Sequence, residues 1–168
     1  MRRGDIVLVD TNIIIEAVRT QCWNALTGYF TVETVEKCRE ESLAGHGRRP
    51  GYVVVPAAAL EQRVTIHRTT DMETVELAVR DPESNNLDLG ERYLWAHALK
   101  RHDNWFACCA DQAAVLAAIR LGWRDRLVSL EALADGAGAK GASRQLKEHF
   151  RTARLSAWRT AALLQGGL

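Results

Sequence analysis

The chain has 168 residues, of which 47% are hydrophobic and 26% are charged, and its formal net charge is +1. This length and balance predict one globular domain with a sizeable core, and they exclude an intrinsically disordered chain. No apolar run approaches the roughly 18 residues of a membrane span, and the apolar stretch after residues 1–5 is too short for a signal peptide. We therefore expect a cytoplasmic protein that has no membrane partner.

The charge is distributed unevenly along the chain. Residues 140–168 hold six basic groups and one acid, a segment charge of +5, so residues 1–139 carry 16 basic and 20 acidic groups, or −4. A basic tail is compatible with an arm that contacts the phosphates of RNA, although a solvated helix face gives the same count. The candidate nucleic-acid contacts are Arg144, Lys147, Arg151 and Arg154.

Cysteine and histidine do not follow the spacing of metal ligands. Cys22, Cys38 and the adjacent pair Cys108 and Cys109 form no C-x-x-C motif, so we expect them to be small core residues. The five histidines are scattered, and we expect His97 to be a partly buried helix residue. The spacing therefore predicts no zinc site, and any bound metal is expected to be held by oxygen.

The first strand is predicted over residues 6–9, an apolar and β-branched run of the kind that is buried on both faces of a parallel sheet. Asp10 follows at the carboxyl end of this strand, where ligands bind in open α/β sheets. Asp10 or Thr11 could instead simply cap the helix that we expect through Val18. The first acid of the chain is thus a candidate site residue with a structural alternative.

A second unit follows, with a helix near residues 23–26, a strand over 28–32 and a helix over 33–41. Glu33, Glu36 and Glu40 are spaced to share one face of that helix, which an exposed acidic stripe would also explain. Because Glu36 lies one turn after the predicted strand end, as Asp10 lies at the end of the first strand, we interpret it as the second site acid.

Residues 43–86 are predicted to be an insertion. Residues 42–51 have the composition of a loop, and residues 52–56 and 63–67 resemble a pair of strands. An amphipathic helix is expected over residues 71–80, with its apolar side chains facing inward. These inward-facing residues are Met72, Val75 and Val79.

The last third of the chain repeats the strand-then-helix pattern. A helix with Gly90 and Glu91 at its start runs to Leu99, a buried strand over 105–110 ends at Asp111, and a helix over 112–121 follows. A final strand over 126–130 and a short helix over 131–134 complete the series. Alternating strands and helices predict an α/β fold in three layers, α/β/α, around a mainly parallel sheet.

Four acids thus occupy equivalent places at strand ends or in the first turns of helices: Asp10, Glu36, Glu91 and Asp111. Carboxylates that cluster repel one another, and an all-oxygen site that keeps them ionised is typical of Mg²⁺ or Mn²⁺. Such ions can activate a water and hold the oxygens of a phosphodiester. An acid at a helix N-terminus also complements the helix dipole without any ligand.

The chain resembles PIN-domain nucleases, which include the ribonuclease toxins of bacterial toxin–antitoxin pairs. The resemblance covers roughly residues 5–133, without the insertion and the basic tail. The segments that carry it are Val7-Leu8-Val9-Asp10-Thr11-Asn12, Thr34-Val35-Glu36, Leu89-Gly90-Glu91 and Ala110-Asp111 with the helix that ends Leu121-Gly122.

The resemblance implies an endoribonuclease that uses Mg²⁺ or Mn²⁺, with the four acids named above as metal ligands and Thr11 or Asn12 orienting Asp10 or the scissile phosphate. It also implies RNA as substrate, an antitoxin protein as partner and a homodimer. Glu33 is an alternative to Glu36, and Asp88 is an alternative to Glu91. The chain departs from the family at Cys109, where serine or threonine is frequent, and a thiol is a weaker hydrogen-bonding group than a hydroxyl.

Two other functions are compatible with the same residues. One is a PIN-fold module that binds RNA or a protein without cleaving it. The other is a doubly wound phosphatase or phosphotransferase in which Asp10 is the nucleophile. Against the second, such enzymes usually carry another aspartate two positions on, where this chain has Asn12.

Overall fold

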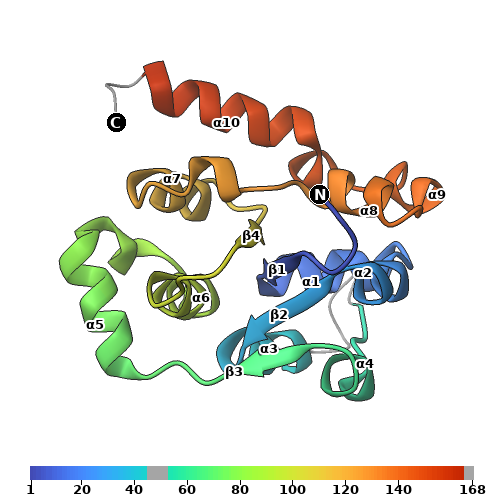
Figure 1. The fold of residues 1–168 in the computed structure, drawn as a ribbon, viewed down its shortest axis with the longest axis horizontal. Helices are drawn as coiled ribbons and strands as arrows, with labels where there is room; N and C mark the ends of the chain where they lie inside the picture. The colour runs from blue at the N-terminus through green and yellow to red at the C-terminus, as the bar shows by residue number, and fades with distance from the viewer. Residues whose placement is uncertain (45–52, 165–168) are drawn as a thin grey trace.

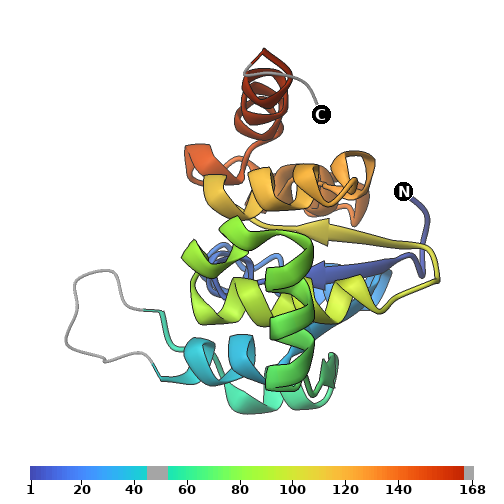
Figure 2. The ribbon, with the colours of Figure 1, turned by 90° about the vertical axis from the view of Figure 1, so that its left-hand side faces the viewer.

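The computed structural model describes residues 1–44 and 53–164, and its centre is a parallel sheet of four strands in the order β3-β2-β1-β4. The strands are β1 (Ile6–Val9), β2 (Thr31–Val35), β3 (Thr65–His67) and β4 (Trp105–Cys108). Strand β1 pairs with β2 and with β4 in parallel, so their carboxyl ends lie at one edge of the sheet (Figures 1 and 2). The sheet of the described residues is entirely parallel, and the expected three-layer α/β/α fold is confirmed.

One face of the sheet is covered by α1 (Thr11–Arg19), α2 (Trp23–Tyr29) and α8 (Leu130–Gly136) (Figure 1). Side chains that alternate along the strands point into this layer, as the pleat requires. The buried residues that join sheet and helices here include Val7, Val9, Ile13, Ile14, Trp23, Leu26, Val32, Cys108 and Leu130. Apolar burial on this scale contributes most of the stabilisation of an α/β layer.

The opposite face is covered by α6 (Leu89–Leu99) and α7 (Gln112–Arg120), and α5 (Asp71–Arg80) packs on the outer side of α6 (Figure 1). Trp95 of α6 is almost completely buried, and its indole N–H donates to the carbonyl of Ala114 in α7 at 3.2 Å. The core of this layer includes Leu8, Val35, Leu77, Leu94, Trp95, Trp105, Ala107 and Val115. The two cores lie on opposite sides of the same four strands.

The second strand begins three residues later than the sequence predicts. Helix α2 continues through Tyr29, and the pairing of β1 with β2 matches Val7 with Val32 and Leu8 with Glu33. The hydroxyl of Thr34 also donates to the carbonyl of Val9 at 2.7 Å, which fixes the same register. As a result, α3 (Glu36–Leu43) starts at Glu36 and Glu33 lies inside the strand.

The insertion does not form the expected hairpin. Residues 53–56 form no strand, α4 (Ala57–Glu61) follows them, and β3 joins the central sheet in parallel beside β2. The predicted loop over residues 42–51 falls mostly outside the described residues. Helix α5 has its predicted bounds, but its apolar side chains Met72, Val75 and Val79 are exposed, and Leu77 is the residue that it buries.

The chain after α7 is also different from the prediction. In place of a strand over residues 126–130, the structure has η2 (Arg124–Arg126) and a single parallel bridge between Ala107 and Leu127. The basic tail folds onto the body as α9 (Lys140–Ser143), η3 (Glu148–Phe150) and α10 (Thr152–Leu164). Within the tail, Leu146 and Phe150 belong to the first core and Leu155 belongs to the second. Earlier in the chain, the short helix η1 (Pro82–Asn86) precedes α6.

The four cysteines are free and buried, as predicted for core residues. None of the helices in the described part of the chain is long and apolar enough to cross a lipid bilayer.

We expect Phe150→Ala to lower the free energy of unfolding by about 3 kcal/mol, because it empties a buried site where the tail meets the first core. Denaturant unfolding followed by circular dichroism measures this change. The control is Arg144→Ala, whose exposed side chain in the same segment should change stability by less than about 0.5 kcal/mol. Equal stability of the two variants would contradict the packing of the tail.

Candidate functional site

Asp10 combines the two roles that the sequence leaves open. It caps α1, because its Oδ1 accepts a hydrogen bond from the amide of Ile13 at 2.8 Å. The side chain is only 1% exposed, and its other oxygen, Oδ2, makes no hydrogen bond of normal geometry among the described residues, although the backbone of Ala110 is close enough to lower the pKa. A cap therefore accounts for one oxygen of Asp10 and leaves a buried oxygen for a ligand.

Asp111 lies beside Asp10 at the same edge of the sheet, because β4 pairs in parallel with β1. It caps α7 in the same manner, with Oδ1 accepting from the amides of Ala113 at 2.7 Å and Ala114 at 3.2 Å. Its negative charge contributes to raising the pKa of Asp10. The two strand-end aspartates that the sequence places together are therefore brought together.

The start of α6 contributes two further acids, Asp88 and Glu91. Asp88 is the cap, and its Oδ1 accepts from the amide of Glu91 at 2.8 Å. Glu91 is 5% exposed, and its Oε1 has no partner within the described part of the chain. Burial, followed by the charges of Asp88, Asp10 and Asp111, raises the pKa of Glu91 to about 9. Both Asp88 and Glu91, which the sequence treats as alternatives, belong to one cluster.

Glu41 is the acid that α3 brings to this cluster. Its Oε2 accepts from the hydroxyl of Thr11 at 2.7 Å, and its Oε1 accepts from the amide of Gly90 at 3.0 Å. Gly90 is required for this contact, because a Cβ at that position would collide with Glu41 Oε2 and lie 3.1 Å from Thr11 Oγ1. Glu41 is therefore held between the residue after Asp10 and the residue before Glu91.

The prediction of Glu36 as the second acid is not supported by its position. Glu36 is exposed at the start of α3 and lines a hollow of about 430 Å³ with Lys37, Arg68 and Tyr93. The alternative, Glu33, is buried in β2, where it accepts from Arg101 and bonds His67. Because α3 begins at Glu36, the acid of this helix that faces Thr11 is Glu41.

One signal in the sequence could have identified Glu41. Cys38 is the only apolar residue in the first turn of α3, and the structure buries it with its thiol 3.4 Å from the carbonyl of Gly90. Residues three apart share a helix face, so Glu41 lies one turn beyond Cys38 on the buried side. The face shared by Glu33, Glu36 and Glu40 exists only if the helix begins at residue 33, and α3 begins at Glu36.

The residues predicted to orient the substrate have different environments. The hydroxyl of Thr11 is committed to Glu41, so Thr11 positions that carboxylate and not Asp10. Asn12 is exposed on the first turn of α1. Cys109 is buried near the acids, and its pKa is raised by burial and then by Asp10. Its thiol is therefore a neutral packing group beside the cluster.

The basic residues of the tail divide into two groups. Arg151 pairs with Glu131 and donates to two backbone carbonyls, and Arg154 pairs with Glu148, so both support the fold of the tail. Arg144 and Lys147 are exposed, and their side chains make no hydrogen bond or ion pair within residues 1–44 and 53–164. The amide of Lys147 donates to Glu16, so this segment lies along α1.

The acids of the cluster offer only oxygen as a ligand atom, and among the described residues the three possible ligands found within 4.8 Å of one another are elsewhere, at Glu33, His67 and His97. Burial is the largest factor that raises the pKa of Asp10, and together with the charges of Asp88 and Asp111 it brings this pKa to about 7. Two buried carboxylate oxygens, Asp10 Oδ2 and Glu91 Oε1, lack partners in the described residues, although buried polar atoms are normally satisfied. A hard divalent ion fits this donor set, since it would pair both oxygens and offset the repulsion.

Comparison of the chain with protein-family models, with curated proteins and with solved structures finds no match.

We expect Asp10→Asn to stabilise the metal-free protein at pH 8 by roughly 2 kcal/mol. The native pKa of Asp10 is raised from 3.8 to about 7, so the native state binds more protons than the unfolded chain across that window, and wild-type stability falls as pH rises through it. Asparagine keeps the cap but cannot ionise. Thermal unfolding in chelator at pH 4 and pH 8 measures the difference.

The matched control is Glu36→Gln, which removes an exposed carboxylate and should leave the pH dependence unchanged. Equal melting temperatures of Asp10→Asn and wild type at pH 8 would contradict a raised pKa of Asp10 in the folded protein.

Proposed function

We propose that the carboxyl-edge cluster binds Mg²⁺ or Mn²⁺ and that the protein is a metal-dependent endoribonuclease. The observation that carries the proposal is a group of acids at strand ends and helix starts whose charges raise one another's pKa, with two buried carboxylate oxygens that lack partners among the described residues. Those acids are Asp10, Asp88, Glu91 and Asp111. The resemblance to PIN-domain nucleases supports the same activity, and an antitoxin and a homodimer stay predictions from that resemblance.

Asp10, Glu91 and Asp111 are the residues proposed to hold the ion, with Asp88 beside them and Glu41 held next to the cluster by Thr11 and Gly90. A bound divalent ion would supply an activated water and neutralise charge on the scissile phosphodiester. Asp10, Asp88 and Asp111 use Oδ1 for their caps, and these caps fix the direction of each carboxylate. The chain thus positions its ligands through backbone amides of three helices.

The same three helices help to hold acids at one edge. The N-termini of α1, α6 and α7 meet there, and their partial positive charge partly offsets the negative charge of the aspartates that cap them. Thr11 and Gly90 restrain Glu41, so its carboxylate does not swing into the space for substrate. The arrangement supports phosphodiester hydrolysis over the phosphatase alternative, because Asp10 is too buried to attack a substrate directly.

We expect Glu41→Gln, Asp10→Asn and Asp111→Asn each to reduce Mn²⁺-dependent cleavage of single-stranded RNA by about a hundredfold or more. The matched control is Glu36→Gln, which lies on the same helix and outside the cluster, and it should retain wild-type activity. Gel analysis of an end-labelled RNA with and without chelator measures cleavage. Cleavage that resists chelator, or full activity of Glu41→Gln with loss in Glu36→Gln, would overturn the proposed site.

RNA binding is expected to involve the free cations that flank α1. The double variant Arg144→Ala/Lys147→Ala should weaken RNA binding and lower the slope of log affinity against log salt by about 1.4, because two single-strand phosphate contacts are lost. The test uses point variants because truncation at residue 140 would also remove buried Leu146 and Phe150.

The control for this prediction is Arg63→Ala/Arg80→Ala, which removes the same charge from other exposed positions. Fluorescence anisotropy in Ca²⁺ or in the Asp10→Asn background measures binding without cleavage. An equal loss of slope in both double variants would show that net charge alone is responsible.

A further inference from the structure

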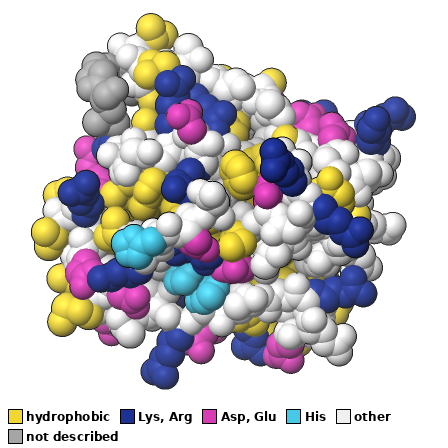
Figure 3. Space-filling view, viewed as in Figure 1, with side chains coloured by type: hydrophobic (Ala, Val, Ile, Leu, Met, Phe, Trp, Pro, Cys, Tyr) yellow, Lys and Arg dark blue, Asp and Glu magenta, His cyan; other side chains and the backbone are white. Residues whose placement is uncertain are grey.

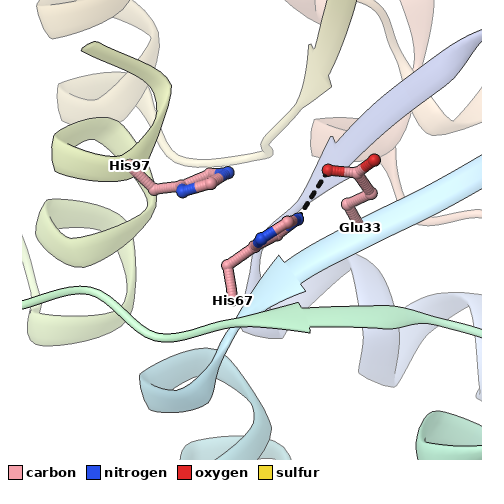
Figure 4. Close-up of side chains that lie close together, drawn as sticks. All are labelled: Glu33, His67 and His97. Atoms are coloured by element: carbon pink, nitrogen blue, oxygen red, sulfur yellow. Dashed lines mark hydrogen bonds and ion pairs between the residues drawn. The ribbon is translucent and has the colours of Figure 1, made fainter. Parts of the chain in front are cut away.

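A second group of possible ligands lies under α6, away from the carboxyl-edge cluster. Glu33 comes from β2, His67 ends the neighbouring strand β3, and His97 projects from α6 toward them (Figure 4). One ligand atom from each residue lies within 4.8 Å of the other two. The register of β2 with β3 matches Val35 with His67, so Glu33 and His67 point to the same face of the sheet.

His97 is arranged as a neutral ligand beside His67. His67 Nε2 is 2.7 Å from Glu33 Oε2, and the two imidazole rings stack with centroids 4.2 Å apart and planes at 21°. His97 Nε2 is 3.1 Å from Arg101 Nη1. Because a guanidinium nitrogen only donates, His97 Nε2 is an acceptor with its lone pair directed into the group. Neutral imidazole is the form that binds metals.

Arg101 places a positive charge among these atoms. Its Nη1 contacts both Glu33 Oε2 and His97 Nε2, and its Nε and Nη2 pair with the carboxylate of Asp103 at 2.9 and 2.5 Å. The guanidinium of Arg101 therefore already lies among the possible ligands. Asp103 is exposed, and its ion pair with Arg101 gives the guanidinium a partner outside this group.

The group is open to solvent on one side. The side chain of His67 is 29% exposed, whereas that of Glu33 is buried. Figure 3 shows histidine side chains at the surface of this face, beside acidic and basic groups. An ion could therefore reach the ligands without unfolding α6.

We propose that Glu33, His67 and His97 form a second metal site, which takes Zn²⁺ or a similar borderline ion in exchange for the side chain of Arg101. Two imidazole nitrogens and one carboxylate oxygen, with a fourth position open to water, are a donor set typical of Zn²⁺. Mg²⁺ prefers oxygen ligands and belongs at the carboxyl edge. The bound ion would cross-link the edge strand β3 to β2 and α6.

The experiment uses the full chain with Asp10→Asn/Asp111→Asn, so that the carboxyl-edge site contributes no binding. We expect calorimetry to show one Zn²⁺ per chain, and Co²⁺ to give the visible absorption of a site with nitrogen ligands. His67→Ala and His97→Ala should each weaken Zn²⁺ binding by at least tenfold. Arg101→Gln should strengthen it about tenfold, because the competing cation is removed.

The matched control is His102→Ala, an exposed histidine next to Arg101, which should bind Zn²⁺ as the parent does. Unchanged Zn²⁺ affinity in His67→Ala and His97→Ala, or no Zn²⁺ binding by the parent, would overturn the site. Should either alanine variant unfold, the ring ¹⁵N resonances of the parent decide, because both histidines must shift on Zn²⁺ addition. Loss or retention of RNA cleavage plays no part in this test.

Discussion

The feature on which the rest of the site depends is the capping of three helices by aspartates at one edge of the sheet. Asp10, Asp88 and Asp111 each accept backbone amides through Oδ1, at the starts of α1, α6 and α7. Parallel pairing of β1 with β4 brings the first and last of these caps together. Capping and ligand binding are therefore not competing explanations for these acids, because the cap occupies one oxygen and orients the other.

This arrangement has a cost that the apolar cores must offset. Asp10 and Glu91 are buried, and burial together with neighbouring charges raises the pKa of both carboxyls. A carboxylate with an unpartnered buried oxygen is a poor contributor to stability. A bound cation would offset this unfavourable burial. Without one, the apolar cores on either side of the sheet supply the stabilisation that opposes it.

The carboxyl-edge cluster of acids and the group of Glu33, His67 and His97 differ in how their charges are compensated. At the carboxyl edge, acids from separate strand ends repel one another and have no basic side chain among the causes of their shifted pKa values. Under α6, Glu33 is neutralised by Arg101 and bonded to His67, so its burial is compensated within the protein. The first group relieves its charge by holding protons to higher pH or, as proposed, by binding an ion, whereas the second is balanced within the protein.

The sequence by itself determined the α/β class, the buried strands β1 and β4, and the acids that end them, because apolar runs and strand-end polarity are local patterns. Only the tertiary structure decided that Glu41, and not Glu36, contacts Thr11 and Gly90, the neighbours of Asp10 and Glu91. A shift of the start of α3 by three residues rotates its faces by about 300°, and that start is set by pairing of β2 with β1. The outward face of Met72 and the contacts of Glu33 with His67 and His97 were likewise fixed by packing between segments distant in sequence.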